Sequence, residues 1–173
     1  MSEFSKVFKN LRKDNNLTQS ELAKKLGVAT STVGMYERAQ REPDFETLEK
    51  ILKAEEGRYD AVAVDFHAEA TSEKQALAFM LDGKVTAVFG THTHVATADE
   101  RLLDKGSGYI TDVGMCGVID SVIGAEIDTA LQKFVSRTFT KKKQPAGKMM
   151  INGVIFTVDD QTHYCTDIKR IKY

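Results

Sequence analysis

Residues 17–37 read LTQSELAKKLGVATSTVGMYE, and this stretch decides how the amino-terminal part of the chain is interpreted. Thr18, followed three residues later by Glu21, is the pattern of a capping box and predicts that a helix begins here. Apolar residues then recur at helical spacing as far as Gly27, a residue that favours the end of a helix. A second short helix is predicted from Thr30. The stretch therefore predicts two helices joined by a glycine-containing turn.

The segments on either side of this stretch also have helical patterns. Residues 3–14 carry apolar side chains at helical intervals, with lysine and arginine on the remaining surface. Asp44 is suited to cap a further helix that runs through Leu52. Together these segments predict a compact all-helical module that contains a DNA-binding helix-turn-helix.

This module resembles the lambda-repressor-like (Xre) helix-turn-helix family over about residues 4–53. The residues that carry the resemblance are Arg12, the run LTQSELA at 17–23, Gly27, Tyr36-Glu37 and Arg41-Glu42-Pro43. The resemblance implies a structural ion pair between Arg12 and Glu37. It also implies a double-stranded DNA partner, with backbone anchors and base-reading side chains at Thr18, Gln19, Thr30, Ser31 and Met35.

The composition changes abruptly near Gly57, where we place a boundary between a domain of residues 1–56 and one of residues 57–173. Residues 59–66 read YDAVAVDF, a near-continuous apolar run that predicts a strand buried on both faces. Strand and helix patterns then alternate, which indicates an α/β region. The expected elements are helices around 71–81 and 127–135, strands at 85–89, 109–113 and 163–171, and a hairpin with its turn at Asn152-Gly153.

Three of the four histidines stand at the ends of predicted strands. Residues two apart in a strand point the same way, so His92 and His94 are expected to approach one metal ion together, with His67 on a neighbouring strand. Imidazoles in such positions suit iron, manganese or zinc. The alternative is that these residues only cap loops, as short polar residues at strand ends often do.

The same region resembles the YmdB-like metallophosphoesterases. The matching motifs are VDFHAEATSEK at 64–74, GTHTHV at 90–95, ITDVGM at 110–115 and DSVIG at 120–124. The resemblance implies half of a metallophosphoesterase sandwich, a two-metal centre that hydrolyses phosphodiesters such as cyclic nucleotides, and His67, His92 and His94 as metal ligands. It covers only the second half of the family's domain, and the carboxylates of the first half have no counterpart in residues 1–56. A two-metal hydrolase needs such carboxylates.

Composition sets further bounds. The 173 residues carry a net charge of −1, so no overall basic field points to nucleic acid, and two cysteines are too few for a disulfide framework. No apolar run approaches the roughly 20 residues of a membrane span. We expect a cytoplasmic protein with no membrane partner.

These observations predict a multidomain fold, with an all-α helix-turn-helix module followed by an α/β region resembling half of a metallophosphoesterase sandwich. The favoured function is a sequence-specific DNA-binding transcriptional regulator rather than an enzyme. Its degenerate carboxy-terminal region would serve dimerisation or the sensing of a ligand or metal. The expected partners are a palindromic operator and further copies of the chain in a homodimer or higher homo-oligomer. The alternatives are a metal-dependent phosphodiesterase acting on cyclic nucleotides or other phosphodiesters, and a non-functional fusion.

Overall fold

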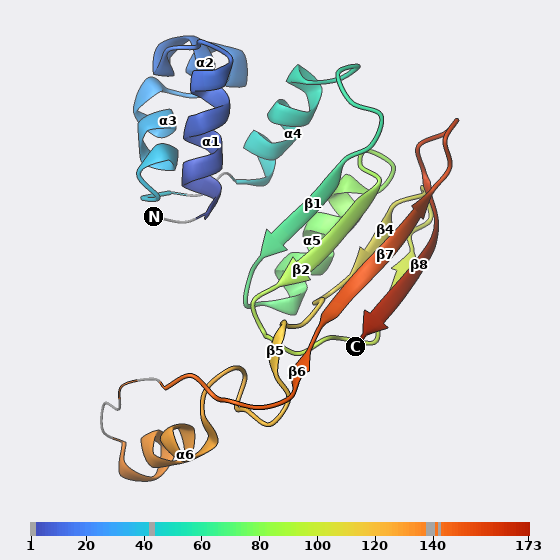
Figure 1. Cartoon of the computed structure of the whole chain (residues 1–173). Helices are drawn as coiled ribbons and strands as arrows, with labels where there is room; N and C mark the ends of the chain where they lie inside the picture. Colours follow the sequence, from blue (N-terminus) through green and yellow to red (C-terminus); the bar gives the residue numbers. More distant parts are fainter. Residues whose placement is uncertain (1–2, 42–43, 138–140, 142) are drawn as a thin grey trace. The chain divides into compact units, whose positions relative to one another are not determined.

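The computed structural model describes residues 3–41, 44–137, 141 and 143–173 (Figure 1). The chain divides into two compact units, one ending at Tyr59 and the other beginning at Asp60. Among the described residues, no helix combines the length and the apolar character needed to cross a membrane.

The first unit contains four helices: α1 (Glu3–Asp14), α2 (Gln19–Leu26), α3 (Thr30–Glu37) and α4 (Phe45–Ala54). The capping box at Thr18 forms, because the Glu21 amide donates to the Thr18 hydroxyl and the Thr18 amide donates to the Glu21 carboxylate. Gly27 ends α2 with a left-handed φ of 62°. Glu42 and Pro43, which belong to one of the sequence motifs, lie outside the described residues.

The core of the first unit forms where α3 packs against its neighbours. Val33 and Tyr36 are fully buried, and the ring of Phe8 on α1 meets that of Tyr36 edge-on at a centroid distance of 5.7 Å. The Tyr36 hydroxyl lies 3.4 Å from that of Thr47 on α4. These contacts bring three helices together around one aromatic side chain.

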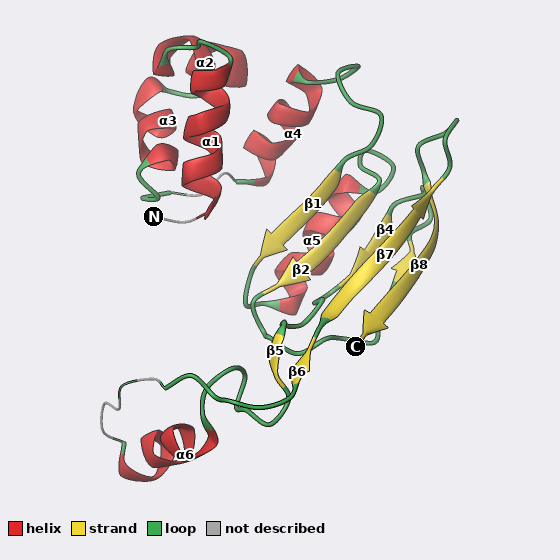
Figure 2. Ribbon diagram, viewed as in Figure 1, coloured by secondary structure: helices red, strands yellow, loops and turns green. Residues whose placement is uncertain are grey.

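The second unit is built on a four-stranded sheet in the order β1-β2-β4-β3. Strands β1 (Ala63–His67), β2 (Ala87–Thr91) and β4 (Gly108–Ile110) are parallel, and β3 (Arg101–Leu102) is antiparallel to β4. Helix α5 (Thr71–Leu81) connects β1 to β2 and covers one face of the sheet, while the hairpin of β7 (Asn152–Val158) and β8 (Cys165–Lys172) covers the other (Figure 2).

The main core of this unit lies between α5 and the sheet. Leu77 and Leu81 of α5 are buried, as are Val88, Tyr109 and Ile110 of the central strands. On the opposite face, the Phe89 and Phe156 rings lie 6.3 Å apart and join β2 to β7. The central strands are therefore covered on both faces, and their carboxyl ends are held at one edge of the sheet.

The remaining elements are β5 (Gly117–Val118), β6 (Met149–Met150) and α6 (Ile127–Ser136). The hairpin expected around Asn152-Gly153 is wrong, because β6 pairs with β5 and Asn152 already belongs to β7. The chain reverses between β7 and β8 instead, where the Asp159 carboxylate accepts hydrogen bonds from the amides of Gln161 and Thr162. Such local side-chain bonds favour a turn as effectively as an Asn-Gly pair does.

The expectation that residues 59–66 form a strand buried on both faces is also wrong. Strand β1 begins at Ala63, and its residues alternate between exposed and half-buried positions. Among the described strands only β2 pairs with it, so β1 is an edge strand of the sheet.

Candidate functional site

The carboxyl ends of the three parallel strands bring a set of polar side chains together. His67 is the last residue of β1, His92 directly follows β2, and Asp112 lies two residues beyond β4. Open α/β sheets bind ligands outside the carboxyl ends of their strands. This edge of the sheet is therefore the first place to look for a site.

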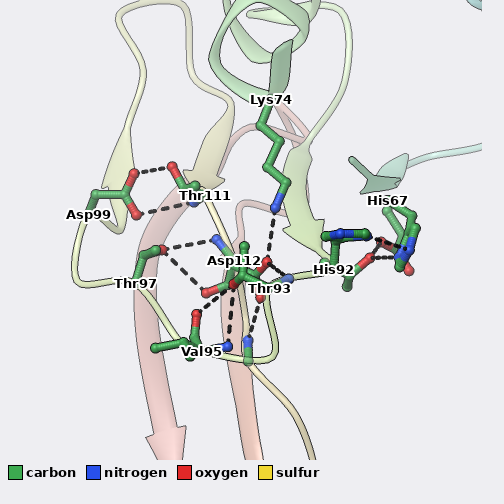
Figure 3. Close-up of polar contacts among 12 residues, drawn as sticks. His67, Lys74, His92, Thr93, Val95, Thr97, Asp99, Thr111 and Asp112 are labelled. Carbon is green, nitrogen blue, oxygen red and sulfur yellow. Dashed lines mark hydrogen bonds and ion pairs between the residues drawn. The ribbon is translucent and has the colours of Figure 1, made fainter. Parts of the chain in front are cut away.

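His67 and His92 form a close pair at this edge (Figure 3). Nε2 of His67 lies 3.1 Å from Nδ1 of His92, and the two ring centroids are 4.9 Å apart. Two imidazole nitrogens bound to one zinc ion at 2.0–2.1 Å in tetrahedral geometry are separated by about 3.3 Å. The observed spacing therefore fits two ligands of a single ion.

A chain of hydrogen bonds fixes which nitrogen of His67 carries the proton and which carries the lone pair. The Thr91 hydroxyl donates to Oδ1 of Asp65 at 3.0 Å, so its oxygen accepts from Nδ1–H of His67, also at 3.0 Å. Nε2 of His67 then carries a lone pair and accepts from Nδ1–H of His92. A metal-binding histidine usually has its other nitrogen held by an acceptor in this way.

His94 does not join the pair. Strand β2 ends at Thr91, and the φ angles of 118° at His92 and 66° at His94 break the extended geometry that would point both side chains the same way. Nδ1–H of His94 donates instead to the Ile123 carbonyl at 2.9 Å. His94 also lines a separate cavity of about 320 Å³, together with apolar side chains that include Met115 and Ile171.

The donors present decide what kind of metal centre is possible. Within the part of the chain that the structure describes, no group of three or more His, Cys, Asp or Glu residues is placed to hold an ion. The pair of His67 and His92 fits two positions of one divalent ion. It does not fit the two-metal centre implied by the resemblance, because two adjacent cations need bridging carboxylate charge.

A buried ion pair lies beside the histidine pair, and the sequence reasoning missed its lysine. Nζ of Lys74 lies 2.9 Å from Oδ2 of Asp112, and the side chains are only 1% and 0% exposed. The Asp112 carboxylate also accepts from the amides of Thr93 at 3.0 Å and Gly114 at 2.9 Å. Burial alone would raise the pKa of Asp112, but the hydrogen bonds from Lys74, Thr93 and Gly114 outweigh it and lower that pKa.

One signal in the sequence could have identified Lys74. It shares the buried face of α5 with Leu77, Ala78 and Leu81, at helical spacing from each of them. A lysine on an apolar helix face needs a buried anion as its partner. Asp112, in the motif that follows β4, is that partner.

The residues expected to contact DNA have other roles or simply face solvent. Thr18 is engaged in the capping box, and Nε2 of Gln19 donates to the Glu37 carboxylate at 2.9 Å. Thr30 and Ser31 are exposed at the start of α3, and Met35 is half-buried.

The expected ion pair between α1 and α3 is present. Nε of Arg12 donates to Oε1 of Glu37 at 2.5 Å, and Nη2 donates to Oε2 at 3.1 Å. The hydrogen bond from Arg12 lowers the pKa of Glu37 and is the largest influence on it; burial acts in the opposite direction. The pair ties these helices together within the first unit.

Comparison with known proteins matches residues 13–171 to the family of YmdB-like proteins. The chain is 45% identical over 127 residues to the 2′,3′-cyclic-nucleotide 2′-phosphodiesterase of Bacillus subtilis, covering 70% of this chain and 48% of that protein. The crystal structure of a novel phosphatase from Mycoplasma pneumoniae matches with a TM-score of 0.70 and 42% identity, over 75% of this chain and 46% of the other. The chain thus spans about half the length of these relatives.

A shorter match concerns a different class of protein. A stretch of 48 residues is 44% identical to the uncharacterized HTH-type transcriptional regulator YqaE of B. subtilis. The match covers 28% of this chain and 41% of the regulator.

These matches correct the fold class expected from the sequence. The YmdB-like match begins at residue 13 and takes in α2, α3 and α4 together with the sheet, so the chain is mostly one α/β phosphoesterase-like domain. The expected fold class, an all-α helix-turn-helix module followed by half a sandwich, is therefore wrong, while the domain boundary expected near Gly57 stays a prediction. The cues behind it are a capping box, which stabilises the start of one helix, and an Arg–Glu pair, which joins two helices; neither feature is confined to DNA-binding proteins.

The expected function and partners are wrong for the same reason. The relatives that cover most of the chain are a phosphodiesterase and a phosphatase, which favours an enzyme over a DNA-binding transcriptional regulator. Neither DNA binding nor a palindromic operator is supported, and Thr18 and Gln19 already have partners within the fold. Operator binding was one of the reasons for expecting a homodimer or higher homo-oligomer, and that reason is lost; the sheet edge at β1, left bare among the described strands, is the other.

Proposed function

The chain belongs to the YmdB-like family, and on that premise we propose that it acts in metal-dependent phosphodiester hydrolysis, with His67 and His92 as ligands of a divalent ion. The observation that carries the proposal is the 3.1 Å approach of Nε2 of His67 to Nδ1 of His92 at the carboxyl ends of adjacent parallel strands. Iron, manganese and zinc all suit imidazole nitrogen.

The roles of the chain's own residues follow from this geometry. His67 and His92 supply two ligand positions, and both side chains are exposed, which leaves the ion open to substrate and water. Thr91 and Asp65 hold His67 in the tautomer whose Nε2 lone pair would face the ion. For His92 to bind through Nδ1, its proton would move from Nδ1 to Nε2, so that both facing nitrogens carry lone pairs. When bound, a divalent ion polarises a phosphoryl oxygen and lowers the pKa of a coordinated water.

The substrate class comes from the relatives. The B. subtilis relative is named for hydrolysis of 2′,3′-cyclic nucleotides, and we propose the same class of small phosphodiester for this chain. The cavity beside His94 offers both apolar and polar side chains, with Met115, Ile123 and Asn152 in its lining. Such a mixed surface suits the organic part of a small ligand.

Hydrolysis by the metal-loaded chain tests the proposal. The full chain loaded with manganese should hydrolyse bis(4-nitrophenyl) phosphate and a 2′,3′-cyclic nucleotide, and chelation should abolish the activity until manganese is restored. His67→Ala should lower kcat/KM by about a hundredfold or more, since it removes a ligand. His163→Ala is the matched control, because His163 lies in the turn between β7 and β8 and is outside the pair.

Two results would contradict the proposal. The first is an absence of turnover with manganese, iron or zinc. The second is turnover that falls equally in the His67→Ala and His163→Ala variants.

A further inference from the structure

The ion pair of Lys74 and Asp112 is fully buried, and it lies next to the loop that carries His92. Taking both charges out of water carries a desolvation penalty that their attraction only partly offsets, so a buried pair is weak support for stability alone. Figure 3 shows Lys74 reaching down from α5 to Asp112, with Thr93 on the other side of the same carboxylate. Oδ2 of Asp112 accepts from Nζ of Lys74 at 2.9 Å and from the Thr93 amide at 3.0 Å.

Thr93 stands between two residues with unusual backbone conformations. His92 has a φ of 118° and His94 a φ of 66°. Residues other than glycine rarely adopt positive φ angles. Such conformations persist only where the surroundings fix them, and they concentrate at functional sites. The Asp112 carboxylate holds the amide of the one residue between them.

The surrounding backbone makes room for this arrangement. A Cβ added at Gly90 of β2 would lie 1.9 Å from the Thr111 carbonyl oxygen and 2.7 Å from Cδ of Lys74. The glycine therefore leaves space both for the neighbouring backbone and for the lysine stem. Asp112 is itself fixed, because its amide donates to the Thr97 hydroxyl at 2.9 Å and its carbonyl accepts from the Thr97 amide at 3.0 Å.

We propose that Lys74 and Asp112 are positioning residues, which hold the Thr93 amide and thereby keep His92 in the orientation that pairs it with His67. The inference deepens the proposed function, because its purpose is to shape the metal site. Lys74 neutralises Asp112 inside the protein, so that the carboxylate remains an acceptor for the Thr93 amide at low dielectric. Neither residue touches the substrate or the ion.

The test compares two variants of the full chain. Lys74→Met/Asp112→Asn removes both charges, so it leaves no unpaired buried ion, while it weakens the hold on Thr93. Leu77→Ala, on the same face of α5 and 1% exposed, destabilises the same core without touching Asp112. Thermal melting is measured first for both variants. The comparison requires that both are folded and that Leu77→Ala is no more stable than the double variant.

Two readouts then separate positioning from stability. Imidazole ¹⁵N shifts of the metal-free protein report the hydrogen bond between His92 and His67, and calorimetric titration with zinc alone reports metal affinity. The double variant should lose the hydrogen-bond signature and bind zinc at least about tenfold more weakly, the range found for residues that orient metal ligands. Leu77→Ala should keep both.

The outcomes are distinct. Retention of the hydrogen-bond signature in the double variant, with zinc affinity within about twofold of the unaltered chain, would overturn the inference. An equal loss in Leu77→Ala would also overturn it. If the unaltered chain binds zinc but hydrolyses nothing, the proposed function fails while the inference stands; if it binds no zinc, the imidazole shifts alone decide.

Discussion

Thr91 connects a carboxylate to a histidine through a single hydroxyl. It donates to Asp65 and accepts from His67, all three residues lying on the adjacent strands β1 and β2. The hydroxyl is the only part of the side chain that this relay needs. Valine has the same shape without the hydroxyl and is well suited to a strand.

Thr91→Val should therefore weaken zinc binding by about tenfold to a hundredfold while leaving the fold intact. The physical reason is that Nδ1 of His67 loses its acceptor, so that the tautomer presenting Nε2 is no longer favoured. Calorimetric titration with zinc measures the effect, and Thr157→Val on β7, an exposed strand threonine, is the control. Equal zinc affinities for the two variants would show that the relay does not orient His67.

At the scale of single residues, the histidine pair of the candidate site could be predicted from the sequence, and its other members could not. Strand-end position was enough to single out His67 and His92, because parallel strands place their carboxyl ends together. The same rule failed for His94, since it assumes that the strand continues, whereas β2 ends at Thr91. Lys74 was missed because a lysine in a helix is ordinarily solvated, and only its spacing from the buried leucines of α5 distinguishes it.

At the scale of elements, α1 and α3 are joined by the ion pair of Arg12 and Glu37. The two side chains are 12% and 4% exposed, and Gln19 at the start of α2 adds a third donor to the carboxylate. Removing one partner of a buried pair leaves the other charge uncompensated. The pair therefore couples the packing of three helices to one carboxylate.

The pKa of Glu37 is lowered in the folded chain, which fixes the sign of its pH dependence. Its stabilising contribution is present above the unfolded-state value of about 4.3 and is lost as the pH falls through the folded-state pKa. At pH 7, Glu37→Gln should lower the free energy of unfolding by about 3 kcal/mol. As the pH falls below about 4.3, the unaltered chain should progressively lose stability that the variant has already lost.

Urea unfolding followed by circular dichroism at each pH measures this difference. Glu46→Gln is the matched control, because the pair of Glu46 with Lys50 on α4 is exposed and should be worth less than about 1 kcal/mol. A Glu37→Gln variant as stable as this control at pH 7 would mean that the Arg12–Glu37 pair contributes nothing to the unit.

Element types were easier to predict than their partners. The helices α1 to α6 lie where apolar spacing places them, with side-chain caps at the starts of α2 and α4, and β2 lies close to its apolar run. The partner of each strand could not be read in the same way. Asn152-Gly153 has the composition of a turn but lies in β7. Seven residue pairs join β7 to β8, and this pairing outweighs a local turn preference.

At the scale of the whole molecule, the extent of a match is more informative than a local resemblance. The cues around Thr18 and Glu37 are strong but cover few residues, whereas the YmdB-like match runs from residue 13 to 171. The chain also spans only about half the length of its relatives. Among the described residues, the histidine pair offers donors that suit one ion and not two.

The most direct test of the account is the zinc-edge X-ray absorption spectrum of the full chain loaded with zinc. We predict one bound ion per chain with two imidazole nitrogens at about 2.0–2.1 Å, and one imidazole in the His67→Ala variant. A spectrum without imidazole scattering, or one that His67→Ala leaves unchanged, would contradict the assignment of His67 and His92 as the metal ligands.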